Sequence, residues 1–282
     1  MMKTPEEKIQ FKNHFFKLGQ GRLIPATDDR FYLVFWTSPR DATDIFDLLT
    51  AYDVQTVRDQ NLPNMLVLIQ VLIQKLSAFA RGPPKKNHQE ILNCVRFLAK
   101  LLPYLFELPH YHSDIELRFF LKPNFDPIRF LTGSAPSLSV HARGSSGDSA
   151  LGVSLVFSLV KLLFVPNFTV DAKAARADGS LCLWEPGLAS SASYQPPDAI
   201  FDSHRSDILK LLLVLVSTTF YERVPNVVIR GSVFTTLLVV AVSKQDFLSL
   251  ICSLTNLVCR SGRALKGDSG LEQDHASLVQ LR

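Results

Sequence analysis

The chain has 282 residues, of which 47% are hydrophobic and 20% charged, and these proportions exclude an intrinsically disordered protein. Its net charge of +4 is small and it has no dense run of Lys and Arg, so no nucleic-acid-binding surface is predicted. The first residues, Met1–Lys8, are charged and lack the apolar segment of a signal peptide. We therefore expect a folded cytosolic protein whose four cysteines are free thiols.

The first predicted helix begins after Thr4 and runs to Leu18. Thr4 and Glu7 have the spacing of a capping box, and Pro5 fits the first helical position. A basic amphipathic helix of this kind either lies in a membrane interface or packs on the protein with a solvated lysine face. The candidate membrane contacts are three lysines on or near its polar side: Lys8, Lys12 and Lys17.

The next segment, Ile24–Asp59, is dense in aromatic residues and predicts three short helices. Thr27 or Asp28 can cap the first helix, and Asp53 is predicted to cap the third. Clustered aspartates also suggest a metal or acid–base site. These ones lie where helix caps and first turns favour carboxylates, so we interpret them as capping residues. The aspartates concerned are Asp28, Asp29, Asp41 and Asp44.

Two long apolar helices follow, over Leu62–Ala80 and Ile91–Glu107. Apolar residues of the second recur every three or four positions, which places them on one stripe of a helix. Arg96 falls outside this stripe and is predicted to lie at the surface. Pro103 is expected to kink or divide the helix.

The second half of the chain alternates helices with long irregular stretches. Pro123–Ala150 is rich in Ser, Gly and Pro and predicts a flexible loop or linker. The predicted helices are Leu151–Val165, Asp207–Tyr221, Val233–Val242 and Asp246–Cys259. The first two are interrupted by lysine and the third is too short, so we expect buried helices rather than membrane spans. The segment Arg260–Gly270 is expected to be loop-like.

These elements predict four parts of the chain. They are an N-terminal helical array over 1–122, a flexible loop or linker over 123–150, a C-terminal helical part over 151–259 with a long loop over 171–206, and an atypical, disordered tail over 260–282. Strands alternating with turns are not found, so all-β and doubly wound α/β folds fit poorly. The residues predict a mostly helical protein that packs against itself.

Candidate chemical sites in the sequence are weak. Gly267–Gly270 reads GDSG, as around a chymotrypsin-type serine, but catalysis there needs a partner histidine and aspartate in a β-barrel fold. His110 and His112, near Glu107 and Asp114, could bind a metal but are expected in a solvated loop. The sequence therefore predicts no catalytic residue, no metal or cofactor site and no small-molecule substrate.

Five blocks in order resemble the N-terminal part of the high-temperature-induced dauer-forming protein family, which is distantly similar to dymeclin. The blocks are IPATDDRFYLVFWTSPRDATDIFDLL, ILNCVRFLAKLLPYLFE, LLFVPNFTV, LWEPGL and DILKLLLVLVSTTFY, and DFLSLICSLTNLVC is a weaker sixth. None of the blocks is a chemical signature, and the resemblance rests on their order and spacing.

The resemblance implies an all-α, armadillo- or HEAT-like stack of helices with two long irregular loops and no enzymatic activity. It further implies a peripheral scaffold on the cytosolic face of Golgi membranes, acting in vesicle sorting and secretion with protein partners. A soluble cytosolic helical adaptor without a membrane role is the alternative. Family members commonly begin Met-Gly and are myristoylated there, whereas this chain begins Met1-Met2-Lys3, so the anchor is not carried over.

Family members are also longer, and Arg260–Arg282 does not resemble what should follow. A truncated gene model, a fragment and a degenerate copy are open explanations. Stacked helices bury their core only against neighbours, so missing partner helices would leave apolar faces uncovered.

Overall fold

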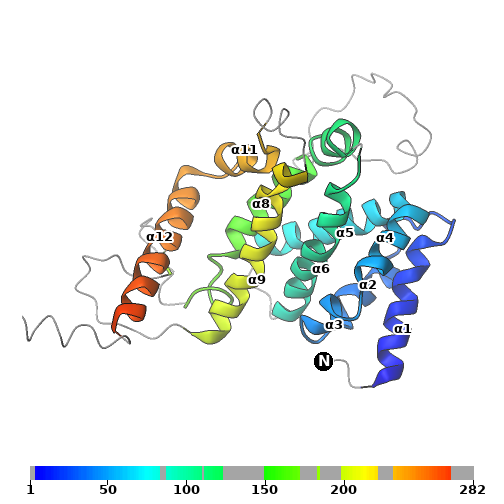
Figure 1. Cartoon of the computed structure of the whole chain (residues 1–282), viewed down its shortest axis with the longest axis horizontal. Coiled ribbons are helices and arrows are strands. Elements are labelled where there is room, and N and C mark those ends of the chain that lie inside the picture. Colours follow the sequence, from blue (N-terminus) through cyan, green and yellow to red (C-terminus); the bar gives the residue numbers. More distant parts are fainter. Residues whose placement is uncertain are drawn as a thin grey trace, which may run out of the picture.

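The computed structural model describes residues 4–82, 87–109, 111–122, 149–171, 183–184, 198–221 and 231–267. Within these ranges the chain is all-α, and its one β-type pairing is an isolated bridge between Pro166 and Val170. The helices stand in an array with α1 at one end and α12 at the other (Figure 1). The predicted all-α stack is confirmed.

Short capped helices build the N-terminal end of the array. They are α1 (Pro5–Phe16), η1 (Lys17–Gly19), α2 (Asp29–Thr37), α3 (Thr43–Phe46) and α4 (Ala51–Gln60). Thr4 and Glu7 form the predicted capping box, and Asp28 caps α2 by accepting from the Phe31 backbone N–H. The prediction that Asp53 caps α4 is wrong, because Thr50 is the cap and Asp53 is its capping-box partner.

Two long helices, α5 (Leu62–Arg81) and α6 (His88–Phe106), form the centre of the array. α5 packs against α4, α6 and α8, whereas α6 packs against α2, α5 and α9. Among the described residues α5 is the one single helix long and apolar enough to cross a membrane, but most of it is buried in this core. α6 is not divided at Pro103, since the helix continues to Phe106.

The second half adds η2 (Tyr111–Phe120, a π-helix), α8 (Leu151–Leu162), α9 (Ala199–Val216), η3 (Thr218–Tyr221), α11 (Val233–Val240) and α12 (Lys244–Gly267). Two predicted boundaries are wrong. α9 begins within the expected 171–206 loop, where Asp198 caps it by accepting from the Ile200 N–H. α12 continues to Gly267, into the segment expected to be loop-like, because a glycine inside a helix, here Gly262, lowers its stability without ending it. The predicted linker falls largely on residues 123–148, outside the described ranges.

One hydrophobic cluster runs through the array and includes residues from both halves. At its N-terminal side Phe11, Phe35 and Phe97 meet with ring centroids 5.6–6.3 Å apart, in edge-on and tilted contacts. Phe11, Phe15 and Leu18 are buried in this cluster, whereas Ile9 is 59% exposed. The burial of these aromatic rings is what fixes α1 and α2 on α6.

Candidate functional site

The three predicted membrane-contact lysines do not lie on one face. The Lys12 ammonium lies 2.7 Å from a carboxylate oxygen of Asp53, on α4. Lys17 lines a groove between α1 and the α2 region, and Lys8 is half-buried. Two of the lysines therefore face different neighbouring elements, and Lys12 is already paired.

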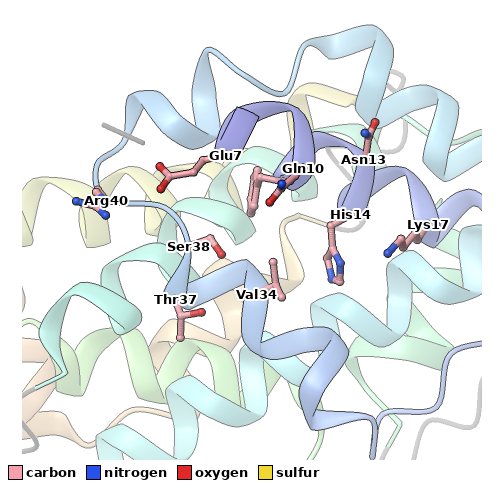
Figure 2. A pocket seen from close by; sticks show the side chains of 10 residues that line it. Glu7, Gln10, Asn13, His14, Lys17, Val34, Thr37, Ser38 and Arg40 are labelled. Carbon is pink, nitrogen blue, oxygen red and sulfur yellow. The ribbon is translucent and has the colours of Figure 1, made fainter. Parts of the chain in front are cut away.

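A groove beside α1 has a volume of about 670 Å³ and is lined mostly by polar residues. Figure 2 shows Glu7 and Arg40 toward one end and His14 and Lys17 toward the other. The remaining lining residues are Gln10, Phe11, Asn13, Val34, Thr37 and Ser38. The groove has one carboxylate and no thiol.

The chemistry of this groove is limited by how His14 is held. Its Nε2 lies 2.8 Å from the carbonyl oxygen of Phe31, so this nitrogen carries the proton and donates it. Burial lowers the pKa of His14, and the nearby Lys17 charge lowers it further. Among the described residues, His14 makes no hydrogen bond to Ser38 or Thr37, and the Thr37 hydroxyl donates to the Leu33 carbonyl oxygen at 2.8 Å.

The most concentrated polar structure lies on α6 and joins elements distant in sequence. The Asn93 amide nitrogen donates to the carbonyl oxygens of Trp36 (2.9 Å) and Pro39 (2.6 Å). Nε and Nη2 of Arg96 both approach one carboxylate oxygen of Asp207 on α9, at 2.8 and 2.7 Å. The prediction that Arg96 lies at the surface is therefore wrong. Both side chains of this ion pair are buried.

A second junction forms around Trp184, from the LWEPGL block. Its indole Nε1 donates to the Leu163 carbonyl oxygen at 3.0 Å, and its ring stacks on Phe164 with centroids 5.6 Å apart. The Arg205 guanidinium lies over the same indole ring, with its Cζ 5.2 Å from the ring centroid. Beside it is a groove of about 440 Å³, lined by Trp184 with residues of α9 and by Leu257 of α12.

The blocks that carry the family resemblance therefore contact one another. The aromatic N-terminal block meets the ILNCVRF block through Asn93, and that block meets DILKLLL through Arg96 and Asp207. LWEPGL meets LLFVPNFTV through Trp184. Sequence reasoning missed these junctions because each partner lies far away in the chain. The buried donors bind backbone carbonyls and a carboxylate, so these polar residues hold helices together rather than face a substrate.

The candidate chemical residues from the sequence form no site in the described part of the chain. Ser269 and His110 lie outside the described residues, and the side chain of His112 is likewise not described. No group of three His, Cys, Asp or Glu could hold a metal ion in the ranges that the structure covers. Cys94 is fully buried, and burial raises the pKa of its thiol. Asp28 and Asp41 accept hydrogen bonds from backbone N–H groups at helix starts, as predicted.

The geometry thus defines an all-α stack whose buried polar groups hold neighbouring helices together. Residues 2–282 match the model of a family described as Hid1, high-temperature-induced dauer-formation protein. This chain belongs to the Hid1 family.

Among curated proteins, the chain is 30% identical to Protein HID1 of Mus musculus over 237 residues, which cover 78% of this chain and 28% of the mouse protein. It is 27% identical to a Hid-1 family protein of Schizosaccharomyces pombe, over 92% of this chain and 30% of that protein. The chain thus spans less than a third of the length of these relatives. No solved structure matches it.

Proposed function

We propose that this protein is a non-enzymatic scaffold, peripheral to the cytosolic face of Golgi-type membranes, which supports vesicle sorting and secretory traffic. The observation that carries the proposal is membership of the Hid1 family over nearly the whole chain. The proposal is also supported by the junctions around Asn93, Arg96 and Trp184, where polar side chains serve helix packing.

Cell fractionation tests the membrane part of this proposal. The tagged full chain is expected to sediment partly with membranes, to be released by high salt and to coincide with Golgi markers. Release by salt separates a peripheral protein from a spanning one, since charge attraction is screened within about 10 Å at 0.1 M salt. A chain that stays wholly soluble and never coincides with Golgi markers contradicts the membrane role.

The lysines of α1 are tested separately on vesicles that contain phosphatidylserine. Each cation near an anionic surface contributes about 1 kcal/mol, and Lys8 and Lys17 do not lie on one face, so Lys8→Ala with Lys17→Ala should weaken binding by about fivefold. Lys12 stays unchanged because its ion pair with Asp53 serves packing. Lys244→Ala, at the opposite end of the array, is the matched control. Binding that the α1 variant does not alter removes the lysines from the proposal.

The alternative is a soluble cytosolic adaptor that binds proteins through exposed helix faces. One relative of this chain, 23% identical over 90% of it, is named Ubp5-interacting protein ftp105 in Schizosaccharomyces pombe. Its name supports protein interaction as a property of that relative. Proximity labelling that returns cytosolic proteins without Golgi residents, together with no vesicle binding, would select this alternative.

A further inference from the structure

Helix α12 has one face that packs on α8 and one face that is exposed. Its inner face contacts α8 and carries Ser249, Leu250 and Ser253, which are 5%, 1% and 0% exposed. Ser253 Oγ accepts a hydrogen bond from the Trp184 backbone N–H at 3.3 Å. On this side, Asp246 also lies 2.8 Å from the Lys161 ammonium of α8. The small polar residues of α12 are thus used on the buried side.

The outer face of α12 is mostly apolar and exposed, and Lys244 and Thr255 are exposed polar residues on the same stripe. Leu248, Ile251 and Val258 are 39%, 42% and 71% exposed. Their spacings of three and seven residues place them on one stripe of the helix. α11, which leads into α12, adds Val239 and Val240, at 59% and 76% exposed. We call these five side chains the outer face.

The helix at the opposite end of the array, α1, provides a comparison for α12. The exposed side of α1 is mostly polar and carries Glu6, Gln10 and Asn13, with Ile9 as an exposed apolar residue. Helical arrays need terminal elements with a polar outer side, because an apolar one causes association. α1 meets this requirement and α12 does not, so α12 has the pattern of an internal helix.

We propose that the outer face is an internal packing surface that takes up a further amphipathic helix of the same stack, of the kind that the longer members of the Hid1 family have the length to supply. Figure 1 places α12 at the end of the array opposite α1, so a helix that covers the outer face would extend the array beyond α12. The matched region covers 28% of the mouse relative and 30% of the yeast one, which leaves residues for many further helices. This inference does not depend on the proposed membrane role.

A membrane span fits the outer face less well. The two helices pass a length test for a span only together, and the chain bends by 114° between them. A further helix of the stack therefore fits this surface better than a span does, and binding to a lipid surface is an outcome of the test below.

Cysteine labelling tests the proposal. Val258→Cys is placed in the 282-residue chain and in a chimera in which this chain replaces the matched segment of mouse HID1, and maleimide labelling is followed peptide by peptide. In the chimera, Val258→Cys should label about tenfold more slowly or less than in the isolated chain. Gln10→Cys on α1 is the matched control and should label equally fast in both. Buried Cys94 should stay unlabelled in both, which reports folding.

Three results overturn the proposal. The first is equally fast labelling of Val258→Cys in chimera and chain. The second is slow labelling of Val258→Cys in a discrete dimer of the isolated chain, which assigns the face to a second copy. The third is protection of the chain by anionic vesicles alone, which assigns it to lipid.

A second variant covers the case of a poorly folding chimera. Ile251→Glu with Val258→Glu should lower the melting temperature of the chimera by several degrees and leave that of the isolated chain unchanged. Leu33→Glu, on an exposed apolar position of α2, should be tolerated in both proteins. Equal tolerance of the double substitution in both proteins counts against the proposal.

Discussion

The two ends of the helical array differ in where they place their polar residues. At the N-terminal end, α1 turns Glu6, Gln10 and Asn13 to solvent and buries Phe11 and Phe15 against α2 and α6. At the C-terminal end, α12 buries serines against α8 and turns leucine, isoleucine and valine outward. Both helices are amphipathic, so hydrophobic content alone does not distinguish them. The two helices differ in which of their sides faces away from the array, a mostly polar side in α1 and a mostly apolar one in α12.

Helix α6 connects these ends. Asn93 fixes it to the N-terminal side through the carbonyl oxygens of Trp36 and Pro39, and Arg96 fixes it to α9 through Asp207. The hydrophobic cluster passes through the same helix without interruption. We therefore expect the two ends to unfold together, although their outer surfaces differ.

The largest expected effect is at Leu98, which is fully buried on α6. Leu98→Asp places an unpaired carboxylate in the core, so it should cost more than about 4 kcal/mol and leave the chain largely unfolded. Circular dichroism and thermal melting measure this. Asn93 and Arg96 lie on the same helix, so both ends of the array should be lost in one transition. Intact helicity and melting temperature would mean that α6 is not the centre of the array.

The next effect is at the α6–α9 junction. Asp207→Ala leaves the buried Arg96 guanidinium without its carboxylate, so it should cost about 3–5 kcal/mol in urea unfolding. Asp202→Ala is the matched control, because Asp202 also pairs with an arginine but its side chain is 41% exposed. Replacing both Arg96 and Asp207 by leucine should recover most of the loss. If Asp207→Ala costs no more than Asp202→Ala, the ion pair does not hold the two ends together.

Local signals in the sequence predicted the parts of this fold that depend on near neighbours. Thr4 and Asp28 cap helices as expected, because a cap and its backbone donors lie within three residues. The apolar residues of Leu62–Ala80 likewise predicted the long helix α5. The start of α9 was missed although Asp198 provides a cap signal, because the polar residues around it resemble a loop.

The junctions could not be predicted in this way. Arg96 and Asp207 are 111 residues apart, and helical periodicity assigns an arginine outside the apolar stripe to the surface. Likewise the sequence predicts one basic face on α1, but Lys12 forms an ion pair with Asp53 on α4. The sequence showed which residues are polar, and only the packing of distant segments shows what they contact.

A smaller effect concerns pH. Burial lowers the pKa of His88, and the neighbouring His204 charge lowers it further. Unfolding returns the pKa of His88 to about 6.5, so the unfolded chain binds more protons and stability falls as pH decreases below that value. Urea midpoints should therefore drop between pH 7.5 and 5.5, and less so in His88→Gln. His14 lies at the N-terminal end and contributes in the same direction, so His14→Gln compares the two regions. Stability that rises toward pH 5.5 in the unaltered chain contradicts the assignment.

The smallest change in stability is expected at the C-terminal end of the array, on α12. Ile251→Glu with Val258→Glu alters side chains that are 42% and 71% exposed, so the free energy of unfolding of the isolated chain should change by less than about 0.5 kcal/mol. Self-association should nevertheless decrease, because an exposed apolar stripe becomes charged. Light scattering against concentration measures this, and Gln10→Glu with Asn13→Glu on α1 is the matched control that should leave association unchanged. If both pairs of substitutions change association equally, the outer face of α12 promotes association no more than the exposed side of α1 does.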